Sequence, residues 1–198
     1  HREDREAIAQ SICDERGATL VRPFDDPWIV AGQGTVGLEI AQHAPALDTV
    51  AAPCSGGGLV SGIALALSKQ RPDTRVISVE PQGFDGMRLS MESGERSTAP
   101  AKGVSIADSL MAPTPGKVPF GIAREVGLRG LAVTDAELSR AVSYAFRKLK
   151  LVIEPGGSAA LAALLAGKIE GKTVAIVLSG GNADPETITK CCSEYPEP

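Results

Sequence analysis

The chain has 198 residues, with 43% hydrophobic and 22% charged residues, values typical of a soluble globular protein rather than a disordered or fibrous one. Its formal net charge of −4 argues against a broad nucleic-acid-binding face. Since no apolar run reaches membrane-spanning length and no signal peptide is visible, we expect a cytoplasmic protein with no membrane partner.

Periodic apolar residues predict helices that alternate with short strands along the chain. We expect helices at 3–16, 35–43, 59–69, 118–125, 135–148 and 155–165. We expect strands at 18–21, 49–52, 75–79, 130–133 and 173–178, the last of them fully buried, and a short helix near 86–91 within the irregular segment 82–119. Such alternation is typical of an α/β protein with an open, twisted parallel sheet covered by helices on both faces.

A stiff, polar link bracketed by prolines, Arg22 to Pro27, follows the first helix. A link of this composition is typical of a boundary between domains. We therefore predict two parts, residues 1–24 and residues 25–198.

Three consecutive glycines, Gly56, Gly57 and Gly58, follow the strand expected at 49–52 and open the next helix. Backbone N–H groups can converge at such a turn because no Cβ atoms interfere, and the helix N-terminus adds partial positive charge. The turn is therefore predicted to bind a phosphate group. A purely structural tight turn is the alternative interpretation.

Two common phosphate motifs fit this turn imperfectly. The P-loop pattern fails because Ile63 stands in place of its lysine. The dinucleotide fingerprint fails because Ser61 stands in place of its third glycine, although Glu80 lies where a ribose-binding acid is expected. A nicotinamide-binding domain is therefore a minor alternative.

A second glycine turn, Ser179 to Asn182, follows the last expected strand. Taken alone, it is compatible with any surface loop. In a parallel sheet, however, both turns belong to the edge formed by the carboxyl ends of the strands, where ligands bind.

Taken together, four stretches resemble the fold-type II pyridoxal-phosphate enzymes, the tryptophan-synthase-β-like group, and most nearly its threonine/serine dehydratases and serine racemase. They follow that family's order and spacing over essentially the whole chain. The stretches are Ala31–Thr35 with Leu38–Ile40, Ser55–Leu59 with Ser61–Gly62, Val152–Gly157, and Leu178–Asn182. The resemblance implies that residues 25–198 form the large cofactor-binding domain and that residues 1–24 are the remnant of a smaller domain.

The resemblance also implies the cofactor, pyridoxal 5'-phosphate, and the residues around it. Backbone N–H groups of the first turn would bind the phosphate, Ser179 would face the pyridine nitrogen, and Phe24 would lie beside the cofactor. Glu154 is a possible active-site carboxylate, with a helix N-terminal acid before Pro155 as the alternative. The phosphate-binding residues would be Ser55, Gly56, Gly57, Gly58 and Leu59.

Two features depart from the family pattern. The family's Schiff-base lysine lies in an N-terminal Ser-x-Phe-Lys-type motif, and no lysine of this chain has that context. Relatives often bind Mg²⁺ or Ca²⁺ after the strand that bears Glu80, where Glu80 and the Phe84 carbonyl would be ligands. Gly86, however, stands where the next acidic ligand is expected.

The resemblance implies β-elimination of L-threonine, L-serine or a similar hydroxy amino acid to a 2-oxo acid and ammonia. Because the lysine motif is absent, we expect a truncated form that is inactive alone. A racemase of the same fold and a non-catalytic phosphate-binding fragment are the alternatives. Ile8, Ile12 and Leu20 would lose packing in such a form, so we expect a homo-oligomer or association with the missing N-terminal segment.

Overall fold

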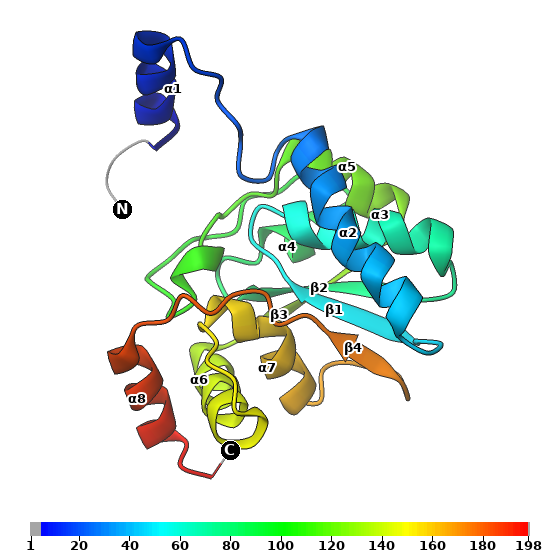
Figure 1. Cartoon of the computed structure of the whole chain (residues 1–198), viewed down its shortest axis with the longest axis vertical. Coiled ribbons are helices and arrows are strands. Elements are labelled where there is room, and N and C mark those ends of the chain that lie inside the picture. The colour runs from blue at the N-terminus through cyan, green and yellow to red at the C-terminus, as the bar shows by residue number, and fades with distance from the viewer. Residues whose placement is uncertain (1–4, 198) are drawn as a thin grey trace.

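The computed structural model describes residues 5–197, which form a parallel sheet between two layers of helices (Figure 1). The strands lie in the order β3-β2-β1-β4, and neighbouring strands pair in parallel. Their bounds are β1 Thr49–Pro53, β2 Arg75–Pro81, β3 Arg129–Val133 and β4 Val174–Ile176. This confirms the predicted open parallel α/β sheet. The strand expected at 18–21 is wrong, because that segment runs along the link after α1 without a neighbouring strand to pair with.

The helices confirm most of the expected ones, but α2 begins earlier than expected and α8 is an additional helix. They are α1 Arg5–Arg16, α2 Pro27–His43, α3 Gly58–Gln70, α4 Gly86–Ser93, α5 Lys117–Glu125, α6 Asp135–Tyr144, α7 Ala159–Leu165 and α8 Pro185–Glu194. Helix α2 begins well before residue 35, because the Asp26 carboxylate accepts hydrogen bonds from the N–H groups of Trp28 and Ile29. Helix α8 was not expected. It begins in the same way, with Asp184 as the capping residue and a proline in its first turn.

Each face of the sheet is covered by its own set of helices. Helices α2, α3 and α5 lie on one face, and α6 and α7 lie on the other (Figure 1). Along β1, Val50 and Ala52 pack into the core beneath α3 and α5, and Ala51 packs into the core beneath α6 and α7. Because successive side chains of a strand point to opposite faces, β1 is buried on both sides.

Strand β4 differs from the fully buried strand expected at 173–178. It is shorter, and all its residues are only half-buried. It pairs with β1 alone and forms an edge of the described sheet, so one side of its backbone faces away from the other strands.

Close packing of α2 on α3 fixes the direction of α3. A Cβ atom at Gly62 of α3 would lie 2.5 Å from the Val30 carbonyl oxygen, and one at Gly37 of α2 would lie 2.8 Å from the Ile63 carbonyl oxygen. The glycines thus allow the two helix backbones to touch. This contact sets where the N-terminus of α3, and with it the first glycine turn, lies.

Helix α1 stands apart from the sheet and its covering helices (Figure 1). Its Ile8 and Ile12 side chains are each 44% exposed.

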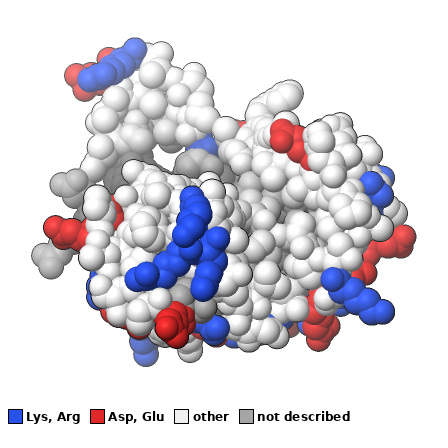
Figure 2. Space-filling model, turned by 60° about the horizontal axis from the view of Figure 1, so that its bottom comes forward, with Lys and Arg blue, Asp and Glu red and all other residues white. Residues whose placement is uncertain are grey.

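On the face drawn in Figure 2, one group of lysine and arginine side chains lies amid largely uncharged surface. Among the described residues, no helix is both long and apolar enough to cross a membrane. The division at residues 24 and 25 stays a prediction.

Candidate functional site

The strand order creates a cleft at the carboxyl edge of the sheet. From β1 the chain continues to β2 and β3 on one side, and it later returns to β4 on the other side of β1. Such a reversal is a topological switch point, at which the connections after neighbouring strands diverge and leave a crevice. The turn at Ser55–Leu59 follows β1 and Ser179 follows β4, so the reversal brings the two glycine turns together.

Both turns line one cavity of about 810 Å³. This volume lies in the usual range for pockets that bind small molecules and cofactors. Ser55 to Leu59 form one wall, and Ser179, Phe24, Gln33 and residues 108–112 contribute to the others. The residues that the sequence predicts to surround a phosphorylated ring thus lie around a single space.

At each glycine of the first turn, neighbouring atoms leave no room for a side chain. Gly57 has a φ of +95°, and a Cβ atom there would lie 2.6 Å from the Met87 Cε. Phe24 excludes side chains at the other two positions, because a Cβ would lie 2.3 Å from its ring at Gly56 and 3.0 Å from its Cβ at Gly58. No larger residue fits at these positions without a shift of the surrounding atoms.

The N–H groups of residues 55–59, which we call the N–H cradle, are available as donors to an anion. Within the described part of the chain, none of the N–H groups of residues 55–59 donates a hydrogen bond to a protein acceptor. The carbonyl oxygens of Gly56 and Gly57, in contrast, accept hydrogen bonds from the N–H groups of Gly116 and Ser61. With the partial positive charge of the α3 N-terminus, these donors suit a phosphate group.

The second turn is held by the segment that precedes α7. The Glu154 N–H donates to the Gly180 carbonyl oxygen at 3.1 Å, and the Ser179 N–H donates to the Gly157 carbonyl oxygen at 3.4 Å. A Cβ atom at Gly157 would lie 2.6 Å from the Gly180 oxygen. This backbone contact fixes Ser179 at the cavity.

The Glu154 carboxylate lies against the second turn, since a Cβ atom at Gly180 would be 2.2 Å from its Oε1 atom. Glu154 is half-buried and is not one of the residues that line the 810 Å³ cavity. Its side chain therefore lies beside Ser179 and Gly180, and its catalytic role stays a prediction.

Sequence reasoning missed the wall formed by residues 108–112. Its first three residues form a short 3₁₀ helix, and the Ala112 N–H donates to the Ser55 hydroxyl at 3.2 Å. The Ser109 hydroxyl lies so close to Gly156 that a Cβ there would be 2.1 Å away. A single helical turn within an irregular segment has no periodicity, so no signal in the sequence marks it.

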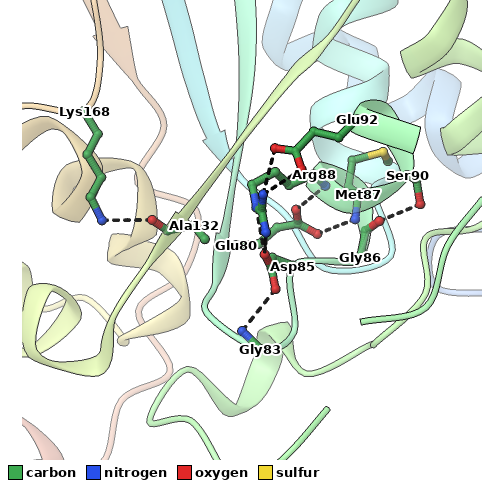
Figure 3. A network of polar contacts seen from close by, with 10 residues as sticks. All are labelled: Glu80, Gly83, Asp85, Gly86, Met87, Arg88, Ser90, Glu92, Ala132 and Lys168. Carbon is green, nitrogen blue, oxygen red and sulfur yellow. Dashed lines mark hydrogen bonds and ion pairs between the residues drawn. The ribbon is translucent and has the colours of Figure 1, made fainter. Parts of the chain in front are cut away.

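No lysine is found among the residues that line the cavity in the described structure. Lys168 illustrates the lysines elsewhere. Its Nζ donates to the Ala132 carbonyl oxygen at 2.9 Å (Figure 3). It also pairs with Glu137 at 2.7 Å. Lys168 is thus engaged with the end of β3 and the first turn of α6.

Glu80 lies at the end of β2 and is fully buried. Its Oε1 and Oε2 atoms accept hydrogen bonds from the N–H groups of Met87 and Arg88, both at 2.8 Å (Figure 3). Burial raises the pKa of Glu80 to about 8, against the opposing effect of these two hydrogen bonds. A carboxylate enclosed in this way is not accessible to a ribose, so the geometry does not support the nicotinamide alternative.

The donor set around Glu80 also does not fit a cation. Both of its oxygens already accept hydrogen bonds, and Gly86 contributes no carboxylate. Among the described residues, no cluster of three His, Cys, Asp or Glu side chains is arranged to hold a metal ion. A Mg²⁺ or Ca²⁺ site at Glu80 and the Phe84 carbonyl stays a prediction without support from this geometry.

Comparison with known proteins places this chain in a family. Residues 1–180 match the family described as "Pyridoxal-phosphate dependent enzyme". The chain is 39% identical over 186 residues to an L-threonine ammonia-lyase of Geobacter sulfurreducens, covering 92% of this chain and 46% of that protein. It is 36% identical over 189 residues to a serine racemase of Oryza sativa subsp. indica, covering 92% and 55%. The chain thus spans about half the length of the curated relatives it matches.

Solved structures show the same relationship. A threonine deaminase from T.th. has a TM-score of 0.86 at 36% identity, covering 93% of this chain and 61% of that one. Maize serine racemase has a TM-score of 0.87 at 33% identity, covering 100% and 61%. With the cofactor-sized cavity and its N–H cradle, these matches show that the chain belongs to the pyridoxal-phosphate-dependent enzyme family, of fold type II.

Proposed function

We propose that the cavity between the two glycine turns binds pyridoxal 5'-phosphate, in a protein that removes ammonia from a hydroxy amino acid by β-elimination of water, which is regained when hydrolysis releases the ammonia. L-Threonine or L-serine is the proposed substrate, and a 2-oxo acid and ammonia are the products. The observation that carries the proposal is the convergence of Ser55–Leu59 and Ser179 on one cavity, with N–H groups as donors. The relatives named L-threonine ammonia-lyase support the reaction class.

Each residue has a separate task in this proposal. The N–H groups of Ser55 to Leu59 hold the phosphate, and Phe24 packs beside the cradle. When bound, the cofactor withdraws electrons from the substrate's α-carbon. The Ser179 hydroxyl would lie beside the pyridine nitrogen, and because a hydroxyl does not hold that nitrogen protonated as a carboxylate does, it would favour fast loss of a β-leaving group. The Glu154 carboxylate supplies negative charge at the same edge.

The lysine that removes the α-proton is proposed to come from polypeptide outside these 198 residues. Supporting this, no lysine lines the cavity among the described residues, and relatives are about twice as long as this chain. We propose that this chain alone is inactive and works with such a segment or as a homo-oligomer. Its cytoplasmic location also stays a prediction.

A racemase of the same fold is the second candidate, supported by relatives named serine racemase. One assay separates the two activities. A longer protein that includes the lysine segment is incubated with L-threonine and with L-serine, and 2-oxo acid and D-amino acid are measured together. We expect 2-oxo acid as the main product. Mainly D-serine would favour the racemase, and no product with either substrate would contradict both.

A further inference from the structure

Helix α4 is capped by a residue of another element. The N–H groups in the first turn of a helix have no partner within the helix, and Asp85, at the N-cap position of α4, forms no side-chain cap. Glu80 of β2 fills this role by accepting hydrogen bonds from the N–H groups of Met87 and Arg88 (Figure 3). Since each oxygen accepts one N–H group, the Glu80 carboxyl group fixes both the position and the rotation of the first turn of α4.

The first residue that Glu80 holds packs against the first glycine turn. Met87 is fully buried and packs in the same core as Cys54 and Phe120. Its Cε lies close to Gly57, where a Cβ would come within 2.6 Å. A shift of Met87 would therefore act on Gly57, the N-cap residue of α3, which has a left-handed backbone conformation.

The outer side of α4 is held separately from this contact. The Arg88 side chain pairs with Asp85 and, at 2.7 Å, with Glu92 (Figure 3). Glu92 is largely exposed, one turn further along the helix than Arg88. This pair lies on the same helix as Met87 but outside the connection from Glu80 to Gly57, and it therefore provides a matched control.

We propose that Glu80 is a positioning residue for the phosphate cradle, acting through Met87 on Gly57. The carboxylate does not touch the ligand. It fixes the position of Met87 against Gly57. This position in turn orients the N–H groups of residues 55–59 toward one phosphate group. This inference rests on the proposed function, because it concerns the same phosphate site.

The test measures binding of pyridoxamine 5'-phosphate, which has no aldehyde and does not react with surface lysines. Pyridoxamine, which lacks the phosphate, is the comparison ligand, and the ³¹P NMR signal of the bound ligand reports on the cradle itself. In Glu80→Gln, an amide N–H₂ group would face a backbone donor. We expect about tenfold weaker binding of the phosphorylated ligand and a shifted ³¹P signal. Pyridoxamine binding should stay unchanged, and Glu92→Gln should behave as the wild type.

A second pair of variants keeps the test decisive if Glu80→Gln does not fold. Met87→Ala removes the side chain that packs against Gly57 and should weaken binding of the phosphorylated ligand about tenfold. Met87→Leu preserves the side-chain volume and should bind this ligand within about twofold of the wild type. A purely structural role would lower the unfolding temperature without changing the ³¹P signal of the folded protein. Wild-type affinity and an unchanged ³¹P signal in Met87→Ala would overturn the inference and leave the proposed function standing. A wild-type chain that does not prefer the phosphorylated ligand would overturn both.

Discussion

Ser55 and Ser179 lie far apart in the sequence and line the same cavity. Ser55 follows β1 and Ser179 follows β4, and these strands are neighbours because the chain returns to the free side of β1 after building β2 and β3. The proposed ligand, with a phosphate at one end and an aromatic ring at the other, is expected to contact both. The strand order therefore creates the site, and the glycines shape it.

Replacing Gly57 with alanine should damage the cradle. The residue has a φ of +95°, and its new Cβ would lie 2.6 Å from Met87 and 2.9 Å from Pro119. We expect a loss of about 1–3 kcal/mol in the free energy of unfolding and loss of pyridoxamine 5'-phosphate binding. Urea denaturation and ligand titration measure the two effects.

Gly32→Ala is the matched control for that variant. Gly32 lies within α2, and a Cβ there would meet nothing within 4 Å. Because alanine has the higher helix propensity, this variant should be as stable as the wild type or slightly more stable, with unchanged binding. If Gly57→Ala matched Gly32→Ala in both stability and binding, steric conflict at Gly57 would be contradicted.

The stability of the protein should fall as pH rises above the ordinary pKa of a glutamate. Glu80 has a pKa of about 8 in the folded protein against an ordinary value of 4.5, so the folded state retains its proton at pH values where the unfolded state has lost it. This contribution is complete below about pH 4.5 and is lost progressively up to about pH 8, by at most about 1.4 kcal/mol per pH unit. Urea denaturation across this range measures the slope. Glu80→Gln should flatten it, and an equal slope in the variant would assign the dependence to other groups.

Divalent cations should have little effect at Glu80. Both carboxylate oxygens already accept N–H groups of α4, so a cation would have to displace them. We expect the unfolding temperature to be the same in EDTA and in excess Mg²⁺ or Ca²⁺. A saturable stabilisation by either ion that disappears in Glu80→Gln would restore the cation site implied by the family resemblance.

The apolar side of α1 should promote association. Ile8 and Ile12 are each 44% exposed on a helix that stands apart from the sheet (Figure 1). Burial of apolar surface contributes about 25 cal/mol per Å², so covering this side is favourable. Light scattering should show oligomers whose proportion rises with concentration. Ile8→Glu combined with Ile12→Glu should reduce association, whereas Gln10→Lys, on another side of the helix, should not. A stable monomer at all concentrations would contradict this prediction.

The sequence predicts the elements near the site better than the contacts between them. Gly56, Gly57 and Gly58 indicate a turn before a helix, and short apolar runs indicate the parallel strands, because both are local signals. Helix α2 begins early because capping by Asp26 and Pro27 outweighs the weak apolar period of its first half.

The sequence does not predict the contacts between distant segments. The contact between Met87 and Gly57 depends on how α4 docks, and α4 is held by a hydrogen bond that Glu80 of β2 accepts from the Met87 N–H. The wall at residues 108–112 likewise depends on where an irregular segment crosses the cleft. Neither has a period or a motif, because both arise from tertiary packing.

A ¹H–¹⁵N NMR titration of this chain with pyridoxamine 5'-phosphate shows whether the two glycine turns bind one ligand. Binding in the cleft between β1 and β4 predicts saturable shifts of the amide signals of Ser55 to Leu59 together with that of Ser179, and much smaller shifts with pyridoxamine. Shifts confined to other parts of the sheet, or a response of the first turn without Ser179, would contradict a single pocket spanned by one phosphorylated ring.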